Sequence, residues 1–123
     1  MALILLIDDS DFARSLTARV LQKAGHRILE ASDGLQGLKL LGSHTPDCII
    51  SDLLMPAMDG QKFLLALRAV SLEIPVLVLT ADVQDKTRAS CLQWGASEVI
   101  YKPPREEPLL AAVDKAIGKE KSA

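Results

Sequence analysis

LILLIDD, residues 3–9, is the stretch of sequence that most constrains the fold. Five consecutive aliphatic residues are typical of a strand that is buried on both faces, and two aspartates follow it directly. A second run, CIIS at residues 48–51, is followed in the same way by Asp52. Because parallel strands end at the same edge of a sheet, Asp8, Asp9 and Asp52 are expected to lie together. Like charges repel each other, so either a cation holds these carboxylates together or the pattern is a coincidence.

Length and composition indicate one domain with an aliphatic core. The chain has 123 residues, of which 49% are hydrophobic and only 3% aromatic. A formal charge of −2, with the basic residues scattered among acidic ones, argues against direct nucleic-acid binding. No apolar run approaches the ~20 residues that span a bilayer, and the N-terminus lacks the basic start of a signal peptide. A cytoplasmic protein without membrane insertion is therefore expected.

Cys48 and Cys91 have no metal-type or redox spacing, and we expect both thiols to be reduced.

Apolar runs alternate with stretches of helical periodicity along the whole chain. This alternation predicts βαβ units, and therefore a parallel sheet covered by helices. The predicted strands are residues 3–7, 27–31, 48–51, 75–80 and 98–101. We expect the domain to cover residues 1–118 and a polar tail to follow at residues 119–123.

The predicted helices rest on apolar residues three or four positions apart and on capping residues. The apolar stripes are Phe12, Leu16 and Val20; Leu35, Leu38 and Leu41; Phe63, Leu67 and Val70; and Leu109, Val113 and Ile117. Ser10 or Asp11 is expected to cap the first helix and Asp33 the second. A fourth helix, over residues 83–94, has few apolar positions and is a candidate mobile element. Trp94, at its end, is expected to cover the core.

Polar residues also follow the fourth and fifth predicted strands. Thr80 ends the fourth strand, and Lys102 follows the fifth and precedes Pro103. Each residue has an ordinary explanation, since Thr is common in strands, a strand-end Lys is often solvated and Asp often caps helices. Together with the three aspartates, however, they supply oxygen ligands for Mg²⁺, a hydroxyl donor and an ammonium group that pairs with phosphate. This conjunction predicts a site for a divalent cation and a phosphoryl group. The bond between Lys102 and Pro103 is a candidate for the cis form.

These residues fall in motifs that resemble the response-regulator receiver domain of two-component signalling. The matching stretches are IDDS at residues 7–10, SDLLMPAMDG at 51–60, LTA at 79–81, GAS at 95–97 and YKP at 101–103. The resemblance covers residues 2–118. It implies a flavodoxin-like three-layer α/β sandwich, with five parallel strands in the order 2-1-3-4-5 and five helices on both faces. It also implies a phosphorylated switch and not an enzyme that acts on an external substrate.

Carried over position by position, the resemblance implies a role for each residue of the site. Asp52 accepts a phosphoryl group from the phosphohistidine of a sensor histidine kinase or phosphotransfer protein. The ligands of Mg²⁺, or of another divalent cation such as Mn²⁺, are Asp8, Asp9, Asp52 and the backbone carbonyl of Leu54. Thr80 and Lys102 bind phosphoryl oxygens, and Thr80 passes the event to a downstream effector that the sequence does not identify. The kinase is expected to bind near Arg14 and Leu16.

Several positions depart from the pattern of the family, Val99 and Asp82 among them. Val99 stands three residues before Lys102, where receivers usually carry an aromatic switch residue. Tyr101 lies on the same face of the strand, so either Tyr101 takes over part of that role or the coupling runs without an aromatic. Simple packing of Tyr101 is the favoured interpretation. Asp82, two residues after Thr80, is acidic and is a candidate partner for Lys102 or for nearby basic groups.

Two other classes of function remain as alternatives. A receiver-like interaction module that works without phosphorylation would be consistent with Val99. A metal-dependent phosphohydrolase that uses Asp52 would need a separate general acid or base, and the sequence offers no candidate for one. The interaction module predicts that no phosphoryl group binds to the domain, whereas the phosphohydrolase predicts turnover of an external phosphate ester.

Overall fold

Five parallel strands form one sheet in the order β2-β1-β3-β4-β5 in the computed structural model, which describes residues 2–53, 60–70 and 73–121. The strands are β1 Leu3–Ile7, β2 Arg27–Ala31, β3 Cys48–Asp52, β4 Val76–Thr80 and β5 Glu98–Tyr101. The order and all five strands confirm the prediction. The bounds differ from the predicted ones by one residue at the end of β3 and one at the start of β4.

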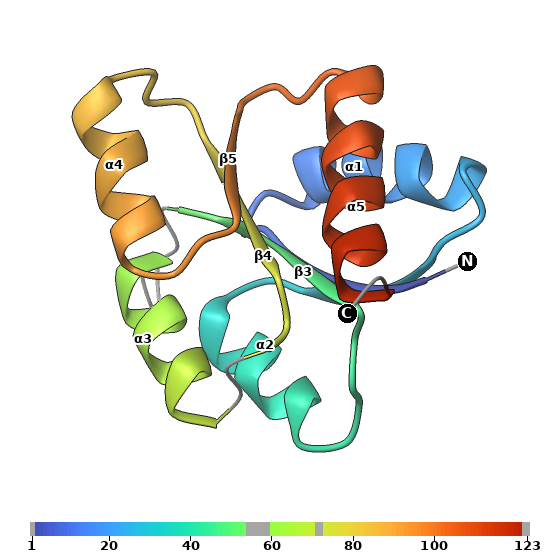
Figure 1. The fold of residues 1–123 in the computed structure, drawn as a ribbon. Coiled ribbons are helices and arrows are strands. Elements are labelled where there is room, and N and C mark those ends of the chain that lie inside the picture. Colours follow the sequence, from blue (N-terminus) through green and yellow to red (C-terminus); the bar gives the residue numbers. More distant parts are fainter. Residues whose placement is uncertain (1, 54–59, 71–72, 122–123) are drawn as a thin grey trace.

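Helices cover both faces of the sheet and complete a three-layer sandwich (Figure 1). The helices are α1 Asp11–Lys23, α2 Gly34–Leu41, α3 Gly60–Val70, α4 Asp85–Gln93 and α5 Glu106–Lys121. Helices α1 and α5 pack on one face, and α2, α3 and α4 on the other. Helix α5 continues to Lys121, three residues beyond the predicted end of the domain, because Gly118 alone does not interrupt it. None of the helices in the described parts of the chain has the length and apolar character needed to cross a bilayer.

Alternating side chains of each strand enter two separate cores. In β1, Ile4 and Leu6 pack with α1 and α5, whereas Leu5 and Ile7 pack with the helices of the other face. Strands β3 and β4 are buried along their whole length, as expected for parallel strands that are covered on both sides. Helix α2 lies so close to β1 that a Cβ atom at Gly37 would be 2.6 Å from Cδ1 of Ile7. The packing of this layer therefore depends on glycine at position 37.

The apolar stripe predicted to bury α1 is not its buried face. Phe12 is 74% exposed and Leu16 is 46% exposed. The buried residues of α1 are Thr17, Ala18 and Leu21. Small residues on this face let the helix lie close to the sheet, a requirement that apolar periodicity does not reveal. In α2, Leu35 is exposed for the same reason, because Gly34 and Gly37 form the buried face there.

The capping residues and cysteines behave as predicted. Ser10 caps α1 by accepting a hydrogen bond from the backbone N–H of Ala13, and Asp33 caps α2 in the same way from Gln36. Cys48 and Cys91 are both buried and free. The expected position of Trp94 is confirmed, since this side chain is half-buried against the core beneath α3 and α4.

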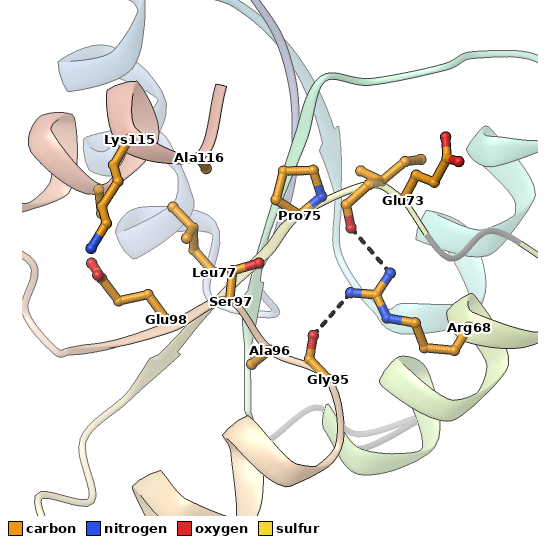
Figure 2. A pocket seen from close by; sticks show the side chains of 12 residues that line it. Arg68, Glu73, Pro75, Leu77, Gly95, Ala96, Ser97, Glu98, Lys115 and Ala116 are labelled. Carbon is orange, nitrogen blue, oxygen red and sulfur yellow. Dashed lines mark hydrogen bonds between the residues drawn. The ribbon is translucent and has the colours of Figure 1, made fainter. Parts of the chain in front are cut away.

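At the amino-terminal edge of the sheet, Arg68 of α3 ties two loops together (Figure 2). Its guanidinium donates to the carbonyl oxygen of Ile74 at 3.1 Å and to that of Gly95 at 2.9 Å. Gly95 adopts a φ of +108°, and a Cβ atom at this position would be 3.1 Å from Nε of Arg68. Burial lowers the pKa of Arg68. These contacts fix the chain that follows α4, next to a pocket of about 600 Å³.

Candidate functional site

The predicted site residues meet at the carboxyl edge of the sheet, opposite Arg68. Asp8 and Asp9 follow β1, Asp52 and Thr80 end β3 and β4, and Lys102 follows β5. The carboxylate oxygens of the three aspartates lie within 4.8 Å of one another. The structure therefore brings together the aspartates that the sequence placed on neighbouring strand ends.

Strand register explains why these particular residues come together. Ile7 pairs with Ser51, so the next residues, Asp8 after β1 and Asp52 at the end of β3, lie side by side. The backbone N–H of Asp8 is fixed by the carbonyl of Ala31, at 3.1 Å. Since both aspartates follow strands that are buried on both faces, their positions are set by the core of the domain.

Lys102 reaches both of these carboxylates from the end of β5, which is two strands away from β3 and three from β1. Its backbone N–H donates to the carbonyl of Thr80 at 2.8 Å, which holds Lys102 at the end of β5. Its Nζ atom lies 3.1 Å from Oδ2 of Asp8 and 3.2 Å from Oδ2 of Asp52. The ammonium group of Lys102 therefore supplies part of the positive charge that holds the clustered carboxylates together.

The site nevertheless keeps an excess of negative charge. Three carboxylates face one ammonium group, and Asp8 is only 1% exposed and Asp52 8%. Burial disfavours the charged form of Lys102, but the attraction of Asp52 and Asp8 outweighs it and raises the lysine pKa above its ordinary value. Oδ2 of Asp8 has no hydrogen-bond partner among the described residues, so its contact with Lys102 is an ion pair without hydrogen-bond geometry. A buried carboxylate oxygen of this kind is suited to a further cation.

The residues present fit a hard divalent cation. Asp8, Asp9 and Asp52 each offer one oxygen to a common point, and oxygen ligands are those that Mg²⁺ and Mn²⁺ prefer. The fourth expected ligand, the backbone carbonyl of Leu54, lies outside the described residues. A Mg²⁺ site usually has one or two carboxylate ligands, and waters and phosphate oxygens complete its coordination. The three aspartates are therefore sufficient without this carbonyl.

Arg14 takes part in building the site, a role that the sequence did not reveal. Its Nη1 atom donates to the backbone carbonyl of Asp8 at 2.7 Å. Its other donors contact Asp11 at 2.7 Å and Glu30 at 3.1 Å. Although burial opposes its charge, these two acids raise the pKa of Arg14. With its donors engaged in this way, Arg14 supports the backbone of Asp8, whereas Phe12 at the same end of α1 is exposed.

Thr80 is buried and is held by Asp82. The backbone N–H of Asp82 donates to Oγ1 of Thr80 at 3.0 Å. Lys102, one of the candidate partners of Asp82, pairs with Asp8 and Asp52 instead. The Asp82 carboxylate accepts hydrogen bonds from Oγ1 of Thr87 at 2.6 Å and from the backbone N–H of Gln84 at 3.0 Å, which lower its pKa in that order. Asp commonly accepts a hydrogen bond from the backbone N–H two residues further along the chain. The contact of Asp82 with Gln84 could therefore have been predicted from the sequence.

A cleft of about 900 Å³ lies in front of these groups. Asp52, Thr80 and Lys102 line it together with Asp82, Thr87 and Trp94. The acid, hydroxyl and ammonium groups of the predicted site are thus accessible from one opening. The peptide bond between Lys102 and Pro103 is cis, as predicted.

Val99, which departs from the family pattern, and Tyr101 lie on one face of β5. Val99 is 5% exposed and Tyr101 is half-buried, and both pack on the core beneath α3 and α4. Tyr101 is the residue of β5 that pairs with Thr80 in the sheet. The prediction that both residues share one face is confirmed, and a switching role for either stays a prediction.

Comparison with known proteins identifies the family. Residues 4–114 match the family described as the response regulator receiver domain. The response regulator MprA of Mycobacterium sp. (strain KMS) is 35% identical over 108 residues, which cover 88% of this chain and 47% of that protein. MprA of Mycolicibacterium vanbaalenii is 36% identical with the same coverage. The chain therefore spans about half the length of these curated relatives.

Solved structures show the same fold. A putative response regulator from Chloroflexus aurantiacus has a TM-score of 0.90 at 27% identity, with 95% of this chain and 98% of that one covered. The chemotaxis response regulator CheY4 of Vibrio cholerae has a TM-score of 0.88 at 33% identity, with 94% and 98% covered. The strand order, the clustered acids and these matches agree, and the chain belongs to the response regulator receiver domain family.

Proposed function

We propose that this domain is a phosphoryl-accepting switch in which Asp52 takes a phosphoryl group from the phosphohistidine of a sensor histidine kinase or phosphotransfer protein. The observation that carries the proposal is the environment of Asp52. Its carboxylate lines an open cleft, lies 3.2 Å from the ammonium group of Lys102 and adjoins the carboxylates of Asp8 and Asp9. A nucleophile, a countercharge and ligands for a cation are thus gathered at one point, as phosphoryl transfer requires.

In this mechanism a carboxylate oxygen of Asp52 forms a bond to phosphorus while the bond between phosphorus and the histidine nitrogen of the donor breaks. Lys102 offsets the negative charge that the phosphoryl group brings to the site. The oxygen of Thr80 already accepts a hydrogen bond from Asp82, so its own hydroxyl proton can be donated to a phosphoryl oxygen. A divalent cation such as Mg²⁺ or Mn²⁺, held by Asp8, Asp9 and Asp52, would further neutralise the transferred group.

The partner that delivers the phosphoryl group is proposed to bind beside α1. Leu16 and Val20 line a largely apolar groove of about 390 Å³ with Pro104 and Leu109, and Lys102 lies at the same groove. An exposed apolar surface next to the acceptor site would bring a donor histidine close to Asp52. The expected contact at Leu16 fits this surface, whereas Arg14 is engaged with Asp8.

A phosphorylation-independent interaction module is the less favoured alternative. Val99 is its support, but Val99 lies in the core and not in the cleft. A module of that kind does not need a lysine fixed between two buried carboxylates. We therefore propose a switch that is phosphorylated and not an enzyme with an external substrate.

The test is phosphorylation of the purified domain by acetyl phosphate in the presence of Mg²⁺, read by intact mass. We expect one acid-labile phosphoryl group in the wild type and none when EDTA replaces Mg²⁺. Asp52→Asn should abolish labelling, whereas Asp114→Asn, an exposed aspartate of α5, should not change it. Equal labelling of the Asp52→Asn variant would refute the assignment of the acceptor.

A further inference from the structure

We infer that Asp82 is a positioning residue that connects Thr80 to α4, so that phosphorylation of Asp52 is passed to this helix through hydrogen bonds of Asp82. The inference rests on the proposed function, because it describes how the same site is read. It concerns the question raised by Val99, which replaces the aromatic switch residue on β5.

Hydrogen bonds of Asp82 form a continuous connection between the site and the first turn of α4. Its backbone N–H donates to the hydroxyl oxygen of Thr80 at 3.0 Å. Its carboxylate accepts from the hydroxyl of Thr87 at 2.6 Å and from the backbone N–H of Gln84 at 3.0 Å. Thr87 belongs to α4 and Gln84 is the residue that precedes the helix. One residue therefore contacts both the buried hydroxyl of the site and the beginning of the helix.

Helix α4 has little else to hold its first turn in place. Gln84 occupies the N-cap position but makes no side-chain capping bond. Cys91, near the other end, is the residue of α4 that is fully buried. Asp85 and Lys86, at the start of the helix, are exposed. The position of this first turn thus depends on Asp82 to an unusual degree.

The opposite end of α4 is fixed. The backbone N–H of Ala96 donates to the carbonyl of Cys91 at 3.0 Å. Arg68 of α3 holds the carbonyl of Gly95 at 2.9 Å, as Figure 2 shows. A helix that is anchored at its C-terminal end and held at its N-terminal end by one polar residue is able to pivot when that residue moves.

Phosphorylation would act on Asp82 through Thr80. A phosphoryl group on Asp52 presents acceptor oxygens to the cleft that Asp52 and Thr80 share. When the Thr80 side chain moves toward them to donate its proton, its oxygen moves with it, so the bond that this oxygen accepts from the N–H of Asp82 breaks or draws Asp82 along. In either case the contacts of Asp82 with α4 change. Helix α4 therefore has two arrangements that the state of Asp52 selects.

The residues of β5 offer no comparable connection. Val99 is apolar and buried. The hydroxyl of Tyr101 makes no hydrogen bond with any of the residues that the structure describes, although Tyr101 pairs with Thr80 in the sheet. The polar path from Thr80 toward the surface thus runs through Asp82.

Trp94 provides the measurement. It is the single tryptophan of the chain, forms the C-cap of α4 and lines the same cleft. We would follow its fluorescence while the domain is labelled with acetyl phosphate and Mg²⁺, and measure labelling of each sample by intact mass. The response is expressed per labelled molecule. Labelling and its transmission to α4 are thereby separated.

We expect Asp82→Ala to reduce the Trp94 response about thirtyfold, the effect of two lost hydrogen bonds of about 1 kcal/mol each on a two-state equilibrium. Thr87→Val removes one of the two carboxylate contacts with little change of shape and should have a partial effect. Asp85→Ala is the matched control, because it removes the same charge from the same end of α4 and Asp85 makes no side-chain hydrogen bond or ion pair in the described parts of the chain. Its response should equal that of the wild type.

Each other outcome rejects a defined part of the reasoning. Unchanged Trp94 responses in labelled Asp82→Ala and Thr87→Val would overturn the inference while leaving the acceptor role of Asp52 intact. So would a labelled wild type whose fluorescence does not change, or an equal loss in Asp85→Ala. A wild type that cannot be labelled would overturn the proposed function and, with it, this inference.

Discussion

The ion pairs of Lys102 offer the most direct test of the electrostatics of the site. Lys102→Met keeps most of the alkyl chain but removes the charge that lies 3.1 Å from Asp8 and 3.2 Å from Asp52. The variant leaves three neighbouring carboxylates without a cation from the chain. We expect it to lower the free energy of unfolding when divalent cations are absent.

The size of this effect follows from the distances and the burial. Two unit charges about 3 Å apart attract each other by about 5 kcal/mol at an effective dielectric constant of ~20 and by about 1 kcal/mol in water. Removing one partner from a fully buried pair costs about 3–5 kcal/mol. Because the side chain of Lys102 is 23% exposed while that of Asp8 is 1% exposed, solvent screens part of the attraction. We therefore expect a loss of about 2–3 kcal/mol.

Urea unfolding in EDTA, followed by circular dichroism, measures this loss. Lys39→Met is the control, because Lys39 is an exposed residue of α2 without an ion pair among the described residues. Titration with Mg²⁺ should then stabilise Lys102→Met more than the wild type, since the cation would replace the missing charge. An Lys102→Met variant as stable as Lys39→Met in EDTA would refute the claim that Lys102 offsets carboxylate repulsion. Equal stabilisation of both proteins by Mg²⁺ would show that the cation binds elsewhere.

Three further predictions concern packing and pH. Gly37→Ala should lower the free energy of unfolding by about 1–3 kcal/mol in a urea titration, because the new Cβ would lie 2.6 Å from Ile7; an unchanged value would mean that α2 shifts freely. Leu21→Ala should cost about 2–5 kcal/mol, whereas Phe12→Ser should change stability by less than about 0.5 kcal/mol, since Leu21 is fully buried and Phe12 is 74% exposed. The pKa of Lys102 is higher in the folded protein than in the unfolded chain, where it is about 10.4, so the charged lysine stabilises the fold. This contribution to the free energy of unfolding is complete below pH ~10.4 and is lost as the pH rises through the higher pKa of the folded state. Thermal melts should therefore show a steeper alkaline loss of stability in the wild type than in Lys102→Met, and parallel curves would contradict the assignment.

The faces of the helices show where apolar periodicity was sufficient and where it was not. In α5, the predicted stripe of Leu109, Val113 and Ile117 is buried. In α1, the predicted stripe contains the exposed residues Phe12 and Leu16. Periodicity detects a run of apolar residues along a helix, but the face that meets a sheet is also selected by how closely the backbone can approach it. Thr17 and Ala18, which lie on this face of α1, carry a weaker apolar signal than the Phe and Leu residues of the predicted stripe.

Some contacts of the polar side chains could likewise be predicted from the sequence, and others could not. That the aspartates and Lys102 share one edge followed from the sequence, because each comes at the end of an apolar run and parallel strands end together. That Arg14 supports the carbonyl of Asp8, and that Asp82 holds Thr87 and not Lys102, did not follow. Long polar side chains have several partners within reach, and the choice among them depends on loop geometry.

By itself the sequence determined the alternation of strands and helices and the identity of the residues at the carboxyl edge, since both are local consequences of apolar runs and the residues that end them. Strand register and the pairing of Lys102 with both Asp8 and Asp52 were decided by the tertiary structure. The link from Thr80 through Asp82 to α4 was decided there as well. These contacts depend on distances of about 3 Å between segments that only the packed sheet brings together, and hydrogen bonds and close ion pairs weaken steeply beyond such distances.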